Sequence, residues 1–214
     1  MIWNKIRNFF LDLFFPKQCL GCGKSNTYLC LDCFRQISLN CQPEVHLGWI
    51  ISAANYADPL VRDLIKTFKY HYVQELSEPL SQLMIKVLEP FGSMLRNQNF
   101  IIVPVPLYKH RLRNRGFNQA ELLAKQIANH FNLPMETDIL KRIASAEPQA
   151  NIKDTEKRKN NIKNVFEVIP DAVEGKNILL VDDVCTTAAT LIEAARVLKS
   201  NNAKEIQAIT VAKG

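Results

Sequence analysis

The stretch from Ile178 to Thr190, ILLVDDVCTTAAT, constrains the fold of this chain more than any other. Its four consecutive apolar residues (178–181) are typical of a strand buried on both faces, as in a parallel sheet. Two adjacent carboxylates, Asp182 and Asp183, follow directly, and then come a turn rich in Thr and small residues and a helical pattern, LIEAARVLKS. Ligands of parallel sheets bind beyond the carboxyl ends of the strands, and the first N–H groups of a helix attract anions. The stretch therefore predicts a cradle for a sugar phosphate.

These thirteen positions resemble, in residue type, the phosphoribosyl-pyrophosphate (PRPP) signature of type I phosphoribosyltransferases. The resemblance implies that Asp182 and Asp183 bind the ribose 2′- and 3′-hydroxyls together with Mg²⁺, and that the next loop wraps the 5′-phosphate. That loop consists of Cys185, Thr186, Thr187, Ala188, Ala189 and Thr190. Ala188 stands where the signature usually has Gly, which costs about 1 kcal/mol if the backbone needs a positive φ there. The alternative is an ordinary strand whose two acids cap the following turn.

Length and composition describe an ordinary globular protein. The 214 residues suit one domain with a small appendage, and 47% hydrophobic with 22% charged residues is typical of soluble proteins. No apolar run approaches the roughly 18 residues needed to cross a bilayer. No cleavable signal is visible either, so we expect a cytoplasmic protein.

The formal charge of +6 is concentrated in one segment. Residues 101–163 hold 12 Lys and Arg against 6 Asp and Glu, whereas the rest of the chain holds 15 of each. A localised positive field indicates an anionic partner, either a phosphorylated small molecule or a nucleic acid.

A dense basic run follows the apolar strand pattern FIIVPV (100–105). Its cations are Lys109, Arg111, Arg113 and Arg115. Arginine offers forked donors that suit phosphate oxygens, and a loop at the carboxyl end of a strand would face the same crevice as the acid pair. We therefore expect these residues to bind pyrophosphate or DNA phosphates, with a merely solvated basic helix start as the alternative. His110 within the run is better interpreted as a surface histidine than as a general base.

Four of the six cysteines form two C-x-x-C pairs, CLGC and CLDC, separated by seven residues. They are Cys19, Cys22, Cys30 and Cys33. Such pairs place two sulfurs on one side of a tetrahedral Zn²⁺ ion, and Gly21 suits a tight knuckle between the first two. The alternative, a pair of disulfides, belongs to secreted proteins. We predict a structural zinc site that the protein fills completely, which leaves no open position for catalysis.

The other two cysteines, Cys41 and Cys185, lie outside this tetrad. Cys185 falls within the predicted phosphate loop, where a nucleophilic role is conceivable. A small buried thiol is the simpler interpretation.

Residues 1–16 show an amphipathic helical pattern that ends before Pro16. Trp3, Phe10 and Phe14 lie on its apolar face, and Asp12 interrupts any signal-peptide core. This face either packs onto the rest of the protein or, through residues 2–14, contacts a membrane surface peripherally. The second possibility would place the protein at the inner face of the membrane.

Apolar runs alternate with helical patterns along the remaining chain. We expect strands at 49–56, 100–105, 165–169, 177–181 and 205–211, and helices at 58–70, 75–91, 117–131 and 189–200. Residues 139–164 are polar and basic. Strands that alternate with helices predict a parallel α/β sheet flanked by helices.

Several motifs occur in the order found in the ComF family of competence-associated proteins. They are the four-cysteine module, VPVPLYKHRLRNRGFNQA, the string Gln149, Arg158, Asn161 and Phe166, and the DDVCTTAAT loop. The chain resembles that family from about Cys19 to its C-terminus. This implies a zinc-finger module, here residues 17–45, fused to a type I phosphoribosyltransferase-like domain, residues 46–214.

The resemblance leaves two classes of function open. The first is a PRPP-binding protein that takes part in DNA uptake during natural transformation, with Mg²⁺, single-stranded DNA and the uptake machinery as partners. The second is an active phosphoribosyltransferase that transfers the phosphoribosyl group of PRPP to a nitrogen acceptor. No motif identifies that acceptor or a catalytic residue.

Overall fold

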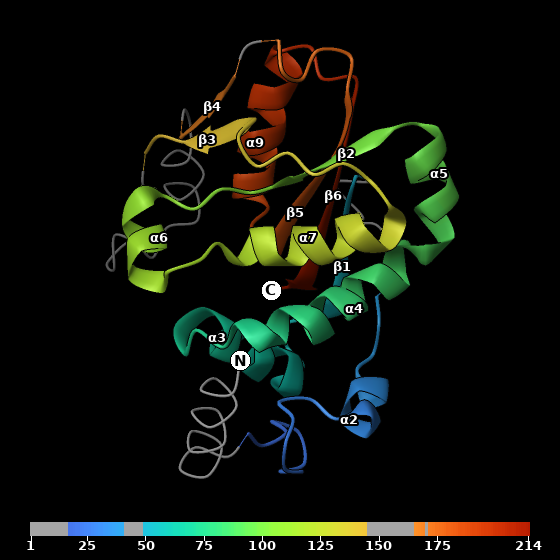
Figure 1. Ribbon diagram of the computed structural model, residues 1–214, viewed down its shortest axis with the longest axis vertical. Coiled ribbons are helices and arrows are strands. Elements are labelled where there is room, and N and C mark those ends of the chain that lie inside the picture. The colour runs from blue at the N-terminus through green and yellow to red at the C-terminus, as the bar shows by residue number, and fades with distance from the viewer. Residues whose placement is uncertain (1–16, 41–48, 145–164, 170) are drawn as a thin grey trace, which may run out of the picture.

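A parallel sheet forms the centre of the computed structural model, which describes residues 17–40, 49–144, 165–169 and 171–214 (Figure 1). Its four strands have the order β1-β6-β5-β2, and every neighbouring pair is parallel. They are β1 (Ile50–Asn55), β2 (Phe100–Pro104), β5 (Asn177–Cys185) and β6 (Glu205–Lys213). A short parallel bridge between Ile102 and Met135 continues the sheet beyond β2. The predicted parallel α/β sheet is confirmed.

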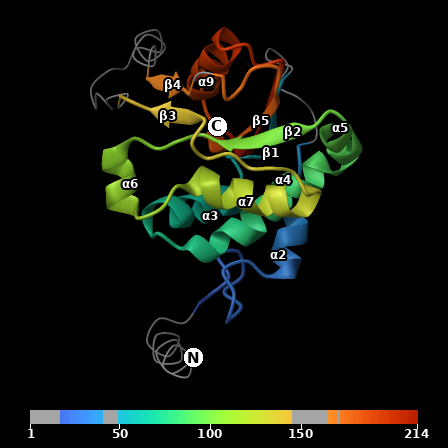
Figure 2. The ribbon, with the colours of Figure 1, turned by 45° about the horizontal axis from the view of Figure 1, so that its top comes forward.

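Both faces of the sheet are covered, as the apolar strand patterns require (Figures 1 and 2). Helices α3 (Pro59–Tyr70), α4 (Ser77–Leu88) and α7 (Gln119–Phe131) pack on one face, and α9 (Ala189–Ser200) packs on the other. The strand side chains toward the three helices are Phe100, Ile102, Leu179, Val181, Ile209 and Val211. Those toward α9 are Ile101, Val103, Ile178, Leu180, Ile206 and Ala208.

The alternation along β5 also determines where the two acids point. Successive side chains of a strand point to opposite faces. Asp183 therefore shares the face of Leu179 and Val181, toward α3, and Asp182 lies on the α9 side.

Shorter elements connect these layers. They are α2 (Leu31–Gln36), the 3₁₀ turns η1 (Gln74–Leu76) and η2 (Glu89–Phe91), α5 (Gly92–Asn97), α6 (Lys109–Arg115), β3 (Leu140–Arg142) and β4 (Phe166–Val168). Strands β3 and β4 form a separate antiparallel pair beside α9 (Figure 2). The sequence pattern predicted 165–169 as a strand of the parallel sheet, and this is wrong. The strand pairs instead with β3, which lies in a polar segment that shows no strand pattern in the sequence.

Two other predictions change in detail. Strand β5 continues to Cys185 instead of ending at Val181, since β6 runs alongside it and pairs Thr210 with Asp182 and Lys213 with Cys185. Both acids consequently lie inside the strand rather than after it. The basic run after β2 forms the helix α6 rather than a loop.

Helix α3 has a well-defined start that fixes its far end. The side chain of Asp58 accepts the N–H groups of Leu60 and Val61 at 2.8 and 3.2 Å, and Pro59 occupies the first turn. One face of the helix is buried in the core. Lys69 lies in the last turn, at the end nearest β5's acids.

The four-cysteine module packs against α3 and α4. Leu60 of α3 contacts the cysteine cluster, Lys86 of α4 lies 4.5 Å from the ring centroid of Phe34, and Lys17 forms an ion pair with Glu75 at 2.7 Å. The predicted helix at 1–16, Cys41 and the basic residues 145–164 lie outside the described residues. Among the described helices, none is long and apolar enough to cross a bilayer.

Candidate functional site

The acid pair lies in the part of β5 nearest its carboxyl end. The Asp183 carboxylate is 2.8 Å from Nζ of Lys69, and Oδ1 of Asp182 accepts the Asp183 N–H at 2.8 Å. The Lys69 and Asp183 side chains are only 18% and 12% exposed. An ion pair so withdrawn from water is screened less than a surface pair, so Lys69 has a strong electrostatic effect on the site.

Arg142 of β3 lies on the other side of the pair. Burial lowers the pKa of Arg142, the charge of Arg111 on α6 lowers it further, and the charge of Asp182 raises it. The guanidinium also stacks over the ring of Phe166, 5.4 Å from its centroid. Arg142 thus brings positive charge to the Asp182 side of the pair.

The electrostatics of Asp182 reflect this crowding. Burial is the main cause that raises its pKa from the ordinary 3.8 to about 7, and the charge of Asp183 raises it as well. Lys69, the Asp183 N–H and Arg142 act in the opposite direction. The pair accordingly favours a ligand that offers hydroxyl donors to its carboxylate oxygens.

The loop after β5 leads directly into α9. Ala188 has φ +57° and ψ 0°, the left-handed conformation, and is 7% exposed, whereas Thr186 and Thr187 are exposed. Among the described residues, no side chain caps the start of α9, so its first N–H groups can bind an anion. Cys185 is buried, in agreement with a packing role for its thiol.

The four cations of α6 have different surroundings. Arg115 lies 5.7 Å from the ring centroid of Tyr70 and donates to Oε1 of Gln119 at 3.1 Å. Lys109, Arg111 and Arg113 are exposed. Of these, Arg111 lies close enough to Arg142 to lower the pKa of its guanidinium. The structure therefore places Arg111 near Arg142, gives Arg115 a structural contact, and shows no contact of Lys109 or Arg113 with the acid pair among the described residues.

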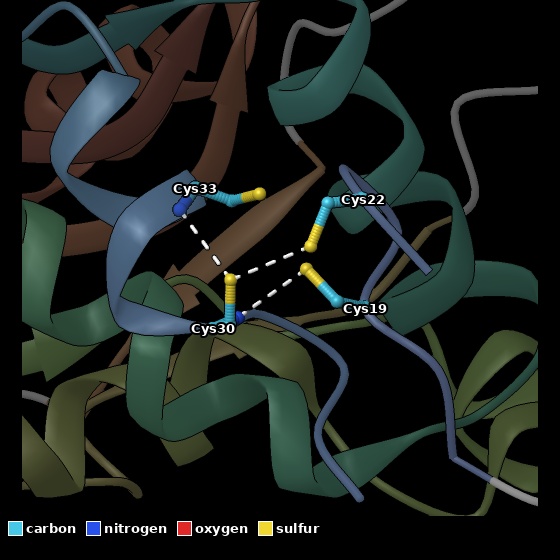
Figure 3. Close-up of side chains that lie close together, drawn as sticks. All are labelled: Cys19, Cys22, Cys30 and Cys33. Atoms are coloured by element: carbon cyan, nitrogen blue, oxygen red, sulfur yellow. Dashed lines mark hydrogen bonds between the residues drawn. The ribbon is translucent and has the colours of Figure 1, made fainter. Parts of the chain in front are cut away.

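The four cysteines of the N-terminal module meet at one point (Figure 3). All four Sγ atoms lie within 4.8 Å of one another, and those of Cys22 and Cys30 are 3.6 Å apart. Zn–S bonds of about 2.3 Å would place tetrahedral sulfurs about 3.8 Å apart. The backbone N–H of Cys30 donates to Sγ of Cys19 at 3.3 Å. The donor set and its spacing fit a tetrahedral zinc ion.

The chain is similar in sequence to several known proteins. The phosphoribosyl transferase domain family matches residues 118–214. The DNA utilization protein YhgH of Escherichia coli (strain K12) is 31% identical over 191 residues, which cover 88% of this chain and 81% of that protein. Competence protein F of Haemophilus influenzae is 30% identical over 195 residues, with the same coverage of each chain. The chain belongs to the ComF family.

Two further similarities extend the comparison. Competence protein ComFC of Bacillus subtilis is 31% identical over 161 residues, which cover 75% of this chain and 62% of that protein. A purine phosphoribosyltransferase from Pyrococcus horikoshii aligns with a TM-score of 0.38 and 15% identity over 64% of this chain and 82% of that one. The family match and the parallel sheet with flanking helices give the type I phosphoribosyltransferase fold, as the sequence predicted.

The environment of the ComF cysteines explains why a cation suits them. Burial alone would raise the pKa of Cys19, but N–H groups of Cys30, Cys22 and Gly21 lower it to about 6. For Cys33, burial and the other thiols raise the pKa. A Cβ at Gly21 would lie 2.7 Å from Sγ of Cys33, so this knuckle requires glycine. The sulfurs are held too close together to ionise jointly without a metal.

Sequence reasoning missed Lys69 and Arg142. Lys69 appears in the sequence as an ordinary basic residue in the last turn of a helix, where lysine is common for reasons of the helix dipole. Arg142 lies in a polar, basic segment that has no clear periodicity. The one sequence feature that could have indicated Lys69 is its place beside the apolar face of its helix, and many surface lysines share that feature.

Proposed function

We propose that this ComF chain binds PRPP with Mg²⁺ at the acid pair and takes part in DNA uptake during natural transformation. The observation that carries the proposal is the acid pair in β5, with Asp182 half-buried and Asp183 buried, shortly before the uncapped start of α9. A sugar phosphate needs hydroxyl acceptors and an anion site side by side, and these two features supply both.

Each part of the ligand has a proposed partner. The two carboxylates accept hydrogen bonds from the ribose 2′- and 3′-hydroxyls, while the 5′-phosphate binds the α9 N–H groups and the loop 185–190. We propose that Arg142, which interacts electrostatically with Asp182, and Arg111, which interacts with Arg142, bind the pyrophosphate. Asp182 and Asp183 would hold Mg²⁺ together with the ligand, and the ion would neutralise part of the pyrophosphate charge.

Thermal unfolding with PRPP and Mg²⁺ tests this part. At a ligand concentration one hundred times its dissociation constant, binding should stabilise the protein by about 2.7 kcal/mol. The double variant Asp182→Asn, Asp183→Asn should lose the effect. Asp63→Asn, which removes an exposed carboxylate from α3, should keep it. An unchanged melting temperature of the wild type at millimolar PRPP would reject PRPP binding.

The role in DNA uptake rests on other features. The relatives are named for competence and DNA utilization, and Lys109, Arg111 and Arg113 form an exposed basic surface on α6. Such a surface suits the phosphates of single-stranded DNA. We propose that α6 contacts the strand directly.

Salt dependence separates this role from PRPP binding. Each phosphate contact with single-stranded DNA contributes about −0.7 to the slope of log affinity against log salt. Replacing Lys109, Arg111 and Arg113 by Ala should flatten the slope by roughly two units. Arg115→Ala, at the cation that stacks on Tyr70, is the matched control and should change the slope little. Absence of salt-dependent binding by the wild type would reject the DNA contact.

A transferase activity is the second candidate, favoured by the family match over 118–214. A nitrogen nucleophile would attack C1 of PRPP and expel pyrophosphate, and the nearby carboxylates would stabilise the positive charge that develops on the ribose. Release of pyrophosphate with a panel of nitrogen bases tests it. Membrane contact through residues 2–14 and the cytoplasmic location stay predictions from the sequence.

A further inference from the structure

Lys69 holds a position that neither the family match nor the sequence motifs explain. It reaches the acid pair from α3, a helix fixed by the Asp58 cap and by its buried face. Its Nζ lies 2.8 Å from Oδ1 of Asp183. Because both side chains are largely buried, packing holds this contact in place.

This contact matters for any metal at the site. Adjacent carboxylates attract divalent cations, which prefer oxygen ligands. A bare divalent ion bound to Asp183 would have to approach the Lys69 ammonium within the same shielded environment, where like charges repel strongly. An ion that arrives with pyrophosphate carries its own compensating negative charge. Lys69 therefore disfavours the bare ion far more than the ion that is bound to pyrophosphate.

We infer that Lys69 is the resident cation of the acid pair, which excludes bare divalent ions and admits the metal only in complex with an anionic ligand. In this role Lys69 is a positioning residue that determines specificity. The first half of the inference rests on the ion pair alone, and the second half rests on the proposed function. The two halves need separate measurements.

Binding of Mn²⁺ alone, followed by electron paramagnetic resonance on the zinc-loaded full chain, tests the exclusion. Lys69→Met should bind one Mn²⁺ at least tenfold more tightly than the wild type. Lys69→Gln, which keeps a hydrogen-bond donor but no charge, should show a similar gain and covers the case in which Lys69→Met does not fold. Lys69→Arg should behave as the wild type.

Two controls assign the gain to the acid pair. Adding Asp183→Asn to Lys69→Met should abolish the new Mn²⁺ site. Lys66→Met, which removes an exposed lysine from the same helix, should leave Mn²⁺ binding unchanged. Equal affinity of wild type and Lys69→Gln for Mn²⁺, or an equal gain in Lys66→Met, would overturn the inference.

The outcome is independent of the proposed function. A wild type that does not bind PRPP would contradict the proposed function. The Mn²⁺ comparison of Lys69 variants would still test the exclusion of bare ions, because Mn²⁺ binding needs no PRPP. If PRPP binds, Mg²⁺ should raise its affinity in the wild type. In Lys69→Gln, Mn²⁺ should then occupy the site before PRPP is added.

Discussion

The acid pair in β5 and the four-cysteine cluster of the N-terminal module both gather groups that repel one another when ionised. At the acid pair, the protein itself supplies compensating charge, from Lys69 on one side and Arg142 on the other. At the cysteine cluster, the sulfurs are in contact with backbone N–H groups and with one another. These contacts bring no full positive charge.

This difference separates two ways in which a protein holds a charged site. A site that its own side chains partly balance is already formed before its ligand arrives, so the ligand can bind and leave. A site balanced only by an external cation makes that cation part of the fold. We therefore expect exchangeable binding at the acid pair and permanent zinc at the cysteine cluster.

Loss of zinc should have the largest effect. We predict one zinc per chain by elemental analysis, and we expect Cys33→Ser to lower the zinc content and to speed hydrogen exchange in residues 17–40. Zinc binding contributes about 10–16 kcal/mol in isolated zinc-finger peptides, so little structure should persist in the module without it. The sheet has its own core and should stay protected.

Cys185→Ser is the control for this experiment. Its thiol is as buried as that of Cys33, yet it lies in β5, so zinc content and exchange in 17–40 should not change. The absence of zinc from protein prepared without chelator would contradict the claim that zinc is a permanent part of the cysteine cluster. So would a Cys33→Ser variant with full protection of 17–40.

An intermediate effect is expected at Asp182. Its folded-state pKa of about 7 exceeds the ordinary 3.8, so the folded chain binds a proton more tightly than the unfolded chain does. The contribution of Asp182 to the free energy of unfolding therefore falls as pH rises from about 4 to about 7. Asp182→Asn removes this penalty and should stabilise the ligand-free protein at pH 8 by about 1 kcal/mol, or roughly 2–4 °C in melting temperature.

Melting curves at two pH values check this prediction. The advantage of Asp182→Asn should shrink between pH 8 and pH 5, because the wild-type carboxyl becomes protonated over that range. The variant should also lose PRPP stabilisation, which would show that the site keeps a destabilising charge for binding. A lower melting temperature of the variant at pH 8 would mean that Lys69 and Arg142 compensate the pair completely.

Local sequence patterns account for some parts of this molecule and not for others. The run 178–181, the start of α9 and the two C-x-x-C pairs depend on neighbours along the chain, and the sequence predicted each of them. Lys69 and Arg142 reach the acids through tertiary packing, which leaves no local pattern. The extension of β5 past Val181 likewise depends on the length of β6, whose Lys213 pairs with Cys185.

The smallest effect concerns the loop that joins the acid pair to α9. Ala188 adopts φ +57°, where an L-residue other than glycine costs about 1 kcal/mol. Ala188→Gly removes this strain but adds freedom to the unfolded chain, so the net gain should be about 0.5 kcal/mol, roughly 1–2 °C. Thermal unfolding without ligand measures it, and PRPP affinity should not decrease.

Ala189→Gly is the matched control, because Ala189 begins the regular helix α9. Glycine there should destabilise by about 0.5–1 kcal/mol, so the two neighbouring substitutions should have opposite signs. If both lower the melting temperature, Ala188 is not strained by its positive φ. The loop conformation would then be held by the packing of α9 and β5, and the acid-pair region would store no backbone strain in addition to its balanced charges.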